Sequence, residues 1–323
     1  MEALFLDLIP GSFVLGLGIV FGLLCGSFLN VVIYRLPRGL SLIQPPSQCP
    51  HCGTRIAPYD NVPVFAYLWL RGRSRCCRQK ISPRYPTVEL IGGLVGGAVV
   101  TMKLLPFAHD LSLSTALVHF WLYLVLALGL IAAAAIDLEH MILPDSITWG
   151  GTVLGLLSSP LRPDVEPLWS AVGALCGYVG VWFPFIWLHE KLRGFPGMGL
   201  GDAKLLALAG AWFGPFGALL TLFGGAIQGT IFAGLTLLIH GKIEEPVAVT
   251  EQRAELLSAI EAAEGAERQA LLDELRADPL GVSPEEAEGG PRVAFGPFLA
   301  LTLLELMLFY GPLRGLLYDY LYI

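Results

Sequence analysis

The chain has 323 residues, of which 54% are hydrophobic and only 15% are charged, and its formal net charge is −7. A soluble globular domain carries about a quarter of its residues as charged side chains, so this balance excludes that class. We expect a protein whose main partner is the lipid bilayer, with no nucleic acid partner.

Charge-poor segments long enough to cross a bilayer follow one another along the chain. A hydrocarbon core of about 30 Å needs about 20 helical residues. Between Leu205 and Ile239 lie 35 residues without a charge, which is too long for one crossing, and Gly214-Pro215 supplies a break. The other six charge-poor segments are residues 11–33, 86–105, 114–136, 142–159, 168–189 and 293–318.

These segments predict an all-α polytopic membrane protein with about eight transmembrane helices and a small cysteine-rich cytoplasmic loop domain. No Lys or Arg precedes the first segment, so we expect a retained anchor and not a cleaved signal peptide. The predicted division is a first anchor (1–34), a cysteine-rich domain (35–85), a transmembrane core (86–242), an insert (243–292) and a last helix (293–323).

Positive charges predict the orientation of the helices. If the N-terminus lies outside, residues 34–85, 137–141, 190–204 and 240–292 share one side of the membrane, and they hold 17 of the 20 Lys and Arg. The positive-inside rule makes that side cytoplasmic.

The insert at 243–292 is a different kind of sequence, with 13 acidic and 4 basic residues. It reads as soluble, and residues 251–277 predict two short amphipathic helices broken at Gly265. A solvated elaboration is the simpler interpretation, and a docking surface for a partner is the alternative.

Four of the six cysteines, Cys49, Cys52, Cys76 and Cys77, fall in the predicted cytoplasmic loop. A Cys-x-x-Cys pair followed some 20 to 30 residues later by two more cysteines is typical of a tetrahedral zinc site. With all four donors used in folding the loop, the metal would be structural.

Three aspartates stand at helix ends on the predicted cytoplasmic face. Asp145 follows Pro144 at the start of a span, so an N-cap and a catalytic role are both open. Asp202 follows a glycine-rich turn containing Gly199 and Gly201, and it too is compatible with a cap. Asp137 lies at a helix C-terminus, where the helix dipole disfavours a carboxylate, so its presence there favours a function.

Asp137 and Asp202 are informative as a pair, because helices ending on the same face can bring them together. Two close carboxyl groups that share one proton act as acid and base: the charged one activates water and the neutral one protonates a carbonyl oxygen or leaving amine. Lys204 either influences which group ionises or extends towards the headgroups. Glu89 and Glu305 lie inside spans, where each has a function or pairs with a neighbouring helix, and Glu89 is the stronger functional candidate.

Six blocks of sequence resemble, in the same order, those of the type IV prepilin leader peptidases, which belong to the GxGD class of intramembrane aspartyl proteases. They are GSFLNVVIYRLP (26–37), CPHC (49–52), ISPRYPTVE (81–89), IDLEHMILPD (136–145), GMGLGDAKLLALAG (197–210) and FGPFLAL (295–301). The resemblance runs nearly end to end. It implies Asp137 and Asp202 as the catalytic pair, supported by Gly199, Gly201, Lys204, Asp145 and Glu89.

The resemblance also implies a substrate and a compartment. Members cut prepilin or pseudopilin precursors after a glycine that precedes a hydrophobic segment, at the cytoplasmic face of the bacterial inner membrane. Many then methylate the new N-terminus with S-adenosylmethionine, so a peptidase without methyltransferase activity is one alternative. A proton-coupled transporter and a non-catalytic scaffold are alternatives from other classes.

The family's zinc loop usually has a second Cys-x-x-Cys pair, and this chain departs from it. Ser74 occupies the expected third position, Cys77 the fourth, and Cys76 stands beside Cys77. A weakened site, a shifted geometry that uses Cys76, and a contribution from His51 are all open.

Overall fold

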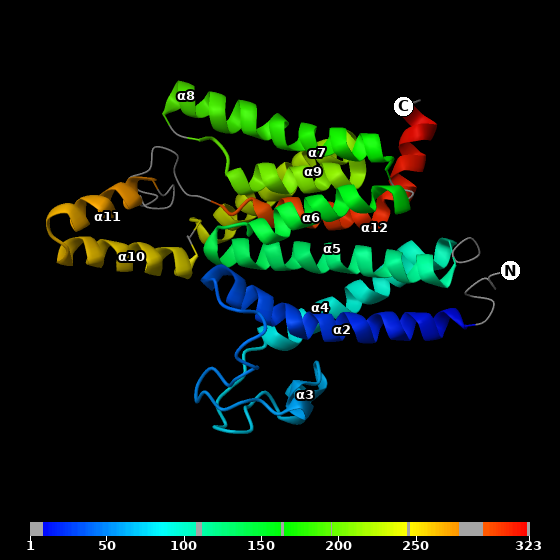
Figure 1. Cartoon of the computed structure of the whole chain (residues 1–323), viewed down its shortest axis with the longest axis horizontal. Coiled ribbons are helices and arrows are strands. Elements are labelled where there is room, and N and C mark those ends of the chain that lie inside the picture. The colour runs from blue at the N-terminus through cyan, green and yellow to red at the C-terminus, as the bar shows by residue number, and fades with distance from the viewer. Residues whose placement is uncertain are drawn as a thin grey trace.

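The computed structural model of the chain describes residues 9–107, 112–162, 165–194, 196–243, 246–277 and 293–321, and these ranges contain helices and no β-strand. The long helices lie side by side along one direction, and a small lobe that includes α3 (Phe65–Trp69) sits beside α2 and α4 (Figure 1). The helices of the bundle are α2 (Gly11–Arg35), α4 (Arg84–Val99), α5 (Leu113–His140), α6 (Asp145–Ser158), α7 (Pro167–Val181), α8 (His189–Arg193), α9 (Leu200–His240) and α12 (Gly296–Leu321).

The predicted class, an all-α membrane protein, is confirmed. Five helical segments of the described chain are long and apolar enough to cross a membrane: Gly11–Arg38, Arg84–Phe107, Leu113–His140, Pro167–Arg193 and Leu200–His240. The predicted number of eight is not confirmed. The helix α6 has only 14 residues, and the part of α12 whose side chains the structure describes, Gly296–Tyr310, is too short to be counted as a span.

The helix α9 breaks at the predicted place. Gly214 has non-helical angles (φ 73°, ψ −175°) and precedes Pro215. Before the break, Gly210 packs on Gly173 of α7, and after it Gly225 packs on Leu299 of α12. The two halves of α9 therefore contact different neighbours.

Arg162 satisfies the backbone carbonyl groups that the break leaves without helical partners. Its Nη1 donates to the Trp212 carbonyl at 2.8 Å and its Nη2 to the Ala211 carbonyl at 3.2 Å, and the hydroxyl of Ser170 donates to the Ala211 carbonyl at 2.6 Å. The guanidinium also lies 4.3 Å from the Trp212 ring centre. A helix end in a buried environment needs such donors.

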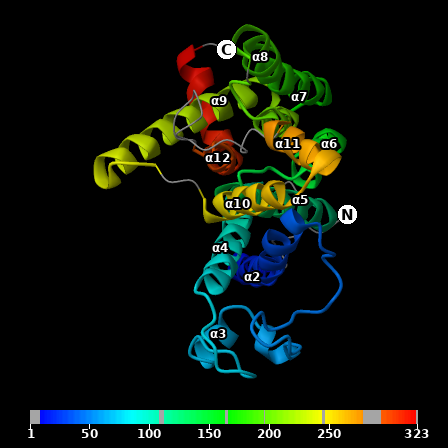
Figure 2. The ribbon, with the colours of Figure 1, turned by 90° about the vertical axis from the view of Figure 1, so that its left-hand side faces the viewer.

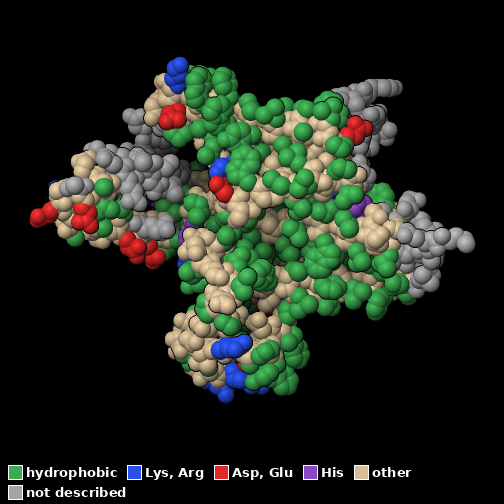
Figure 3. Space-filling model, in the orientation of Figure 1, with side chains coloured by type: hydrophobic (Ala, Val, Ile, Leu, Met, Phe, Trp, Pro, Cys, Tyr) green, Lys and Arg blue, Asp and Glu red, His purple; other side chains and the backbone are tan. Residues whose placement is uncertain are grey.

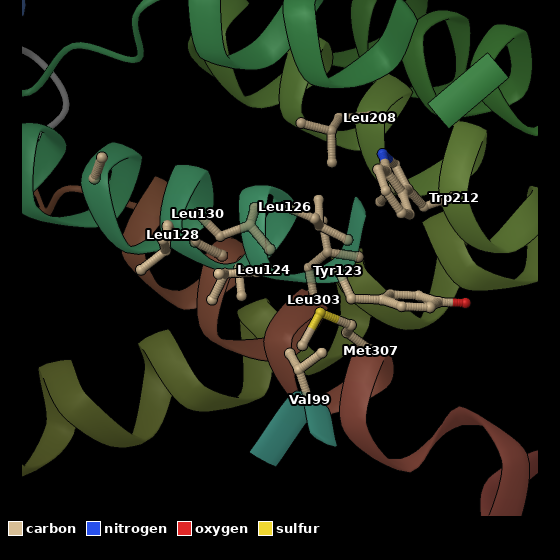
Figure 4. Close-up of a cluster of buried hydrophobic side chains, with 14 of the residues drawn as sticks. Val99, Tyr123, Leu124, Leu126, Leu128, Leu130, Leu208, Trp212, Leu303 and Met307 are labelled. Atoms are coloured by element: carbon tan, nitrogen blue, oxygen red, sulfur yellow. The ribbon is translucent and has the colours of Figure 1, made fainter. Parts of the chain in front are cut away.

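The helix α5 lies at the centre of the bundle and contributes most to its core. Tyr123, Leu124 and Leu130 of α5 are at most 2% exposed, and they lie among side chains of α9 and α12 such as Trp212 and Leu303 (Figure 4). This packing fixes the position of the last turn of α5, where Asp137 lies.

The insert begins with two helices, α10 (Val247–Ala262) and α11 (Gly265–Ala277), which meet at Gly265 (φ 59°) as the sequence predicts. The helix α10 contacts α5, and its Val249 is only 3% exposed (Figure 2). The beginning of the insert is therefore docked on the bundle. The rest, 278–292, lies outside the described residues.

Candidate active site and metal site

Asp137 occupies the last turn of α5, which ends at His140 and Met141 (φ 52°). Its side chain is buried, with 5% exposed, and its carboxylate accepts a hydrogen bond from the backbone N–H of Gly296. Gly296 is the first residue of α12. The end of one helix and the start of another therefore fix this carboxylate.

Asp202 is the third residue of α9, and it is 8% exposed. Its carboxylate accepts a hydrogen bond from the backbone N–H of Gly199, the N-cap residue of the helix. In a capping box, the side chain of the third helical residue accepts a hydrogen bond from the N-cap backbone N–H in the same way. A Cβ at residue 199 would lie 3.2 Å from Asp202 Oδ2, so glycine leaves room for the carboxylate.

The structure brings the two predicted aspartates together. The carboxyl groups of Asp137 and Asp202 are close enough to interact electrostatically. Leu143, in the connection between α5 and α6, packs against a glycine near each aspartate. A Cβ at Gly296 would lie 3.1 Å from Leu143 Cδ1, and a Cβ at Gly201 would lie 2.9 Å from Leu143 Cβ. Small residues beside each aspartate thus allow the three segments to meet.

Lys204 lies against Asp145. Its Nζ is 2.5 Å from Asp145 Oδ1, which ties the start of α6 to the start of α9. The N-cap residue of α6 is Pro144 and Asp145 is the first helical residue, so the N-cap interpretation was wrong; the side chain of Asp145 makes this ion pair instead. This ion pair connects the two helices, and the influence of Lys204 on the ionisation of the aspartate pair stays a prediction.

Glu89 and Glu305 both have partners in the described chain. Glu89 Oε2 accepts a 2.6 Å hydrogen bond from the backbone N–H of Val64 (φ 60°), just before α3, so it attaches the cysteine-rich lobe to α4. Glu305 Oε2 accepts a 2.8 Å hydrogen bond from Gln228 Nε2, which joins α12 to α9. Both contacts correspond to helix and domain packing.

Sequence reasoning missed three residues of this region. Gly296 and Leu143 lie within quoted blocks of the sequence but received no role, although a glycine-proline pair at a helix start is itself a signal. His140, one turn after Asp137, is 7% exposed, and its Nε2 has no hydrogen-bond partner among the described residues. No sequence pattern distinguished it from a residue of the loop.

The four predicted cysteine ligands form one cluster in the lobe. Their Sγ atoms all lie within 4.8 Å of one another, with Cys49 3.7 Å from Cys77 and Cys52 3.3 Å from Cys76. Four thiolates around a tetrahedral zinc at 2.3 Å stand about 3.8 Å apart. The donor set and its spacing therefore fit a zinc ion.

Two similar turns build this cluster. Gln48 pairs with Arg55 in one turn and Arg73 pairs with Lys80 in the other. The hydrogen bond from Cys49 N to Thr54 O has its counterpart from Ser74 N to Gln79 O. In this register Ser74 takes the place of Cys49, and Cys76 brings the fourth sulfur into the cluster, which favours the shifted geometry among the three alternatives.

Two of the four cysteines lie beside groups that favour the thiolate, which is the form that binds metal. The hydroxyl of Thr54, 3.3 Å from Cys52 Sγ, lowers the pKa of Cys52 to about 6. The hydroxyl of Ser74, 3.1 Å from Cys77 Sγ, lowers the pKa of Cys77 as well. The hydrogen bond with Cys52 raises the pKa of Cys76, because the two thiols share a proton.

These features define a class of protein: a helical membrane protein with two buried, adjacent carboxyl groups at the ends of different helices and a separate cluster of four cysteines. Residues 20–103 match the family model described as the bacterial peptidase A24 N-terminal domain, and residues 124–234 match that of the type IV leader peptidase family. The cysteines lie in the first match and both aspartates in the second. The chain belongs to the type IV leader peptidase family.

Curated relatives support this assignment. The prepilin leader peptidase/N-methyltransferase of Pectobacterium carotovorum subsp. carotovorum is 37% identical over 72% of this chain and 87% of the relative. The proteins with the same name from Stutzerimonas stutzeri and Pseudomonas putida are 38% and 40% identical, over 69% and 70% of this chain and 82% and 83% of the relatives. No solved structure matches the chain.

Proposed function

We propose that this chain is an aspartic endopeptidase that cleaves the leader from type IV prepilin-like precursors, with Asp137 and Asp202 as its catalytic pair. The observation that carries the proposal is the adjacency of these two buried carboxyl groups, each held by a backbone N–H of a glycine. Family membership and the names of the relatives support the reaction and the substrate class.

Two adjacent buried carboxyl groups supply an acid and a base. The ionised carboxylate takes a proton from a water molecule, which attacks the carbonyl carbon of the scissile peptide bond. The protonated carboxyl group donates its proton to the carbonyl oxygen. When the C–N bond breaks, the carboxyl group that took the proton from water passes it to the leaving amine, and the first carboxylate takes its proton back from the tetrahedral intermediate. The N–H groups of Gly199 and Gly296 hold the two carboxyl groups in place during these transfers.

The site lies where an extended substrate backbone is tolerated. Asp137 is in the last turn of α5 and Asp202 in the first turn of α9, at the same end of the bundle. Water and protein groups at a membrane boundary satisfy the backbone of an unwound substrate helix. The distribution of Lys and Arg assigns this end to the cytoplasm, and we infer the bacterial inner membrane as the location.

The relatives' names add a second activity, N-methylation of the new N-terminus, and S-adenosylmethionine is the methyl donor that we propose. The described segments give no residue to assign to this step. The cysteine cluster would hold a structural zinc ion through Cys49, Cys52, Cys76 and Cys77, and the ion would fix the two turns of the lobe.

The test is cleavage of a prepilin-like peptide by purified enzyme in detergent, followed by mass spectrometry. We expect the wild type to cut after a glycine and Asp137→Asn and Asp202→Asn to be folded and at least 1,000-fold slower, on the order of the loss of a catalytic acid or base. Glu166→Gln is the control, because this carboxyl group is exposed just before α7, and it keeps its turnover within a few fold. Unchanged cleavage by either pair variant would disprove the assignment of that residue.

Incubation with S-adenosylmethionine then tests methylation as a mass increase of one methylene group on the mature peptide.

A further inference from the structure

The cysteine-rich lobe, residues 35–85, has a charge opposite to that of the whole chain. It contains nine Lys and Arg and a single acidic residue, Asp60, whereas the chain has a net charge of −7. Arg75 pairs with Asp60 at 2.7 Å, which leaves an excess of positive charge on the lobe. Four of its basic side chains near the second turn are exposed: Arg71, Arg73, Arg78 and Lys80.

The same lobe exposes large apolar side chains on its one short helix. Phe65, Leu68 and Trp69 of α3 are 60%, 66% and 71% exposed, and the rings of Phe65 and Trp69 stack at 6.0 Å. Tyr59, just before this helix, is 65% exposed. A soluble surface rarely gathers such side chains without a partner.

The position of the helix α3 is fixed relative to the membrane helices. The lobe is joined directly to α2 at Arg35 and to α4 at Arg84. The hydrogen bond from Val64 N to Glu89 Oε2, at 2.6 Å, attaches the start of α3 to the second turn of α4, and Asn30 Nδ2 donates to the Tyr85 carbonyl at 3.1 Å. The helix α3 is therefore held beside the bundle and cannot extend freely into the cytoplasm.

The apolar and basic side chains of the lobe lie next to one another (Figure 3). In Figure 1 the lobe lies beside α2 and α4, on the lateral surface of the bundle. Figure 3 shows that hydrophobic side chains cover the side of the lobe that faces the N-terminal end of α2, which is the direction in which the apolar spans run. The visible Lys and Arg lie on the front and along the lower edge of the lobe, next to these hydrophobic side chains.

We propose that α3 is seated in the cytoplasmic leaflet of the bilayer that holds the bundle, with Phe65, Leu68 and Trp69 at the boundary between headgroups and acyl chains. Aromatic side chains favour this depth, and exposed Lys and Arg on the lobe bind the phosphates of anionic lipids. The lobe is then a second, interfacial anchor. The proposal rests on the cytoplasmic orientation inferred above but not on the peptidase activity.

The test is photolabelling of the full-length protein in nanodiscs of phosphatidylethanolamine and phosphatidylglycerol that contain a phospholipid with a diazirine in its acyl chain. We expect mass spectrometry to find lipid adducts on residues 62–70 as well as on α2 and α4. Adducts on α2 and α4 with none on residues 62–70 would overturn the proposal, because the spans report that labelling worked.

A matched variant separates lipid contact from general reactivity. Phe65→Ser/Leu68→Ser/Trp69→Ser is expected to reduce labelling of residues 62–70 at least fivefold while labelling of α2 and α4 stays constant. Hydrogen exchange of the turns at 48–55 and 73–80 verifies that the lobe remains folded. Arg71→Gln/Arg73→Gln, which keeps the apolar residues, tests the electrostatic part. In nanodiscs with phosphatidylglycerol, residues 62–70 of this variant should be labelled less than those of the wild type. When phosphatidylcholine replaces phosphatidylglycerol, the variant and the wild type should be labelled equally.

Other occupants of this surface give different results. Excess precursor that abolishes lipid adducts on residues 62–70 would show that α3 binds the hydrophobic segment of the substrate and not lipid. Labelling that appears only when nanodiscs contain one copy, and disappears when they contain two, would show a contact between copies. Either result would refute the interfacial anchor, and neither depends on whether Asp137 and Asp202 are catalytic.

Discussion

The backbone N–H of Gly296 donates a hydrogen bond to the carboxylate of Asp137, although 159 positions separate the two residues in the sequence. A Cβ at residue 296 would lie 2.6 Å from Asp137 Oδ2 and 3.1 Å from Leu143 Cδ1. The first residue of α12 is thus in direct contact with the candidate acid or base. Only a residue without a side chain permits this approach.

Gly296→Ala is therefore expected to impair catalysis more than folding. The added methyl group displaces the Asp137 carboxylate or α12, and loss of one positioned hydrogen bond at a reacting group costs on the order of 100-fold in turnover. The measurement is kcat on a prepilin-like peptide, with thermal unfolding in detergent as the fold check. Gly234→Ala is the control, because nothing lies within 4 Å of a Cβ there. An equal effect of both substitutions would contradict the special role of Gly296.

The register of the two cysteine turns predicts a rescue. Ser74 occupies the place of Cys49 in the second turn, whereas the fourth sulfur comes from Cys76. Cys76→Ser should lose bound zinc, and Ser74→Cys/Cys76→Ser should regain one zinc per chain, because four sulfurs at equivalent positions again surround the metal. Elemental analysis and competition with a chelator measure this. No recovery in the double variant would show that the two turns are not equivalent for metal binding.

Removal of the metal should affect the lobe and leave the bundle intact. The lobe has few buried apolar side chains, among them Cys49 and Ala66, whereas the bundle has an extensive apolar core. Chelation is expected to increase hydrogen exchange in residues 48–80 and to leave α5 and α9 protected. Equal exchange with and without chelator would contradict a structural metal.

Arg162→Met is expected to destabilise the bundle far from the candidate site. Arg162 is 5% exposed and donates to carbonyl groups beside the Gly214 break, and each carbonyl left unsatisfied in a buried environment costs about 1–3 kcal/mol. The expected result is a clearly lower unfolding temperature in detergent, with kcat retained below that temperature. The control is Arg193→Met, whose side chain is exposed at the end of α8. An unfolding temperature as high as that of the wild type would show that other groups cap the break.

The acidic insert is expected to attract a basic leader. Exposed Glu251, Glu255, Glu261 and Glu264 lie on or next to α10, which is docked on α5. Their replacement by Gln, which leaves the packing of Val249 intact, should raise KM several fold at low ionic strength and much less at high salt, because salt screens exposed charges. Deletion of residues 245–290 should have the same effect. KM values that are independent of salt in both variants would exclude this role.

Much of the candidate site follows from sequence patterns of short range. The aspartates at 137 and 202 stand at helix ends, the glycines precede Asp202, and the break at Gly214-Pro215 interrupts an uncharged segment. Each of these features depends on local backbone rules and on the free energy of burying charge in lipid, so each can be predicted from the sequence without knowledge of the tertiary contacts. The cysteine spacing is local in the same sense, and the four cysteines that it singles out do cluster.

Other features depend on which helices become neighbours. The partner of Lys204 is Asp145 and not the nearby Asp202, because α6 packs beside the first half of α9. Glu89 attaches the lobe because Val64 returns to α4. No single-residue pattern indicates such pairings.

The sequence by itself determined the class of protein and the residue types capable of the chemistry, and it predicts the side of the membrane on which the positive charges gather, because these depend on composition and spacing along the chain. Only the tertiary structure decided that Gly296 holds Asp137, that Arg162 caps the break in α9, and that α3 faces outward beside the bundle. These contacts join segments far apart in the sequence, and the close packing of helices through glycines determines which atoms meet.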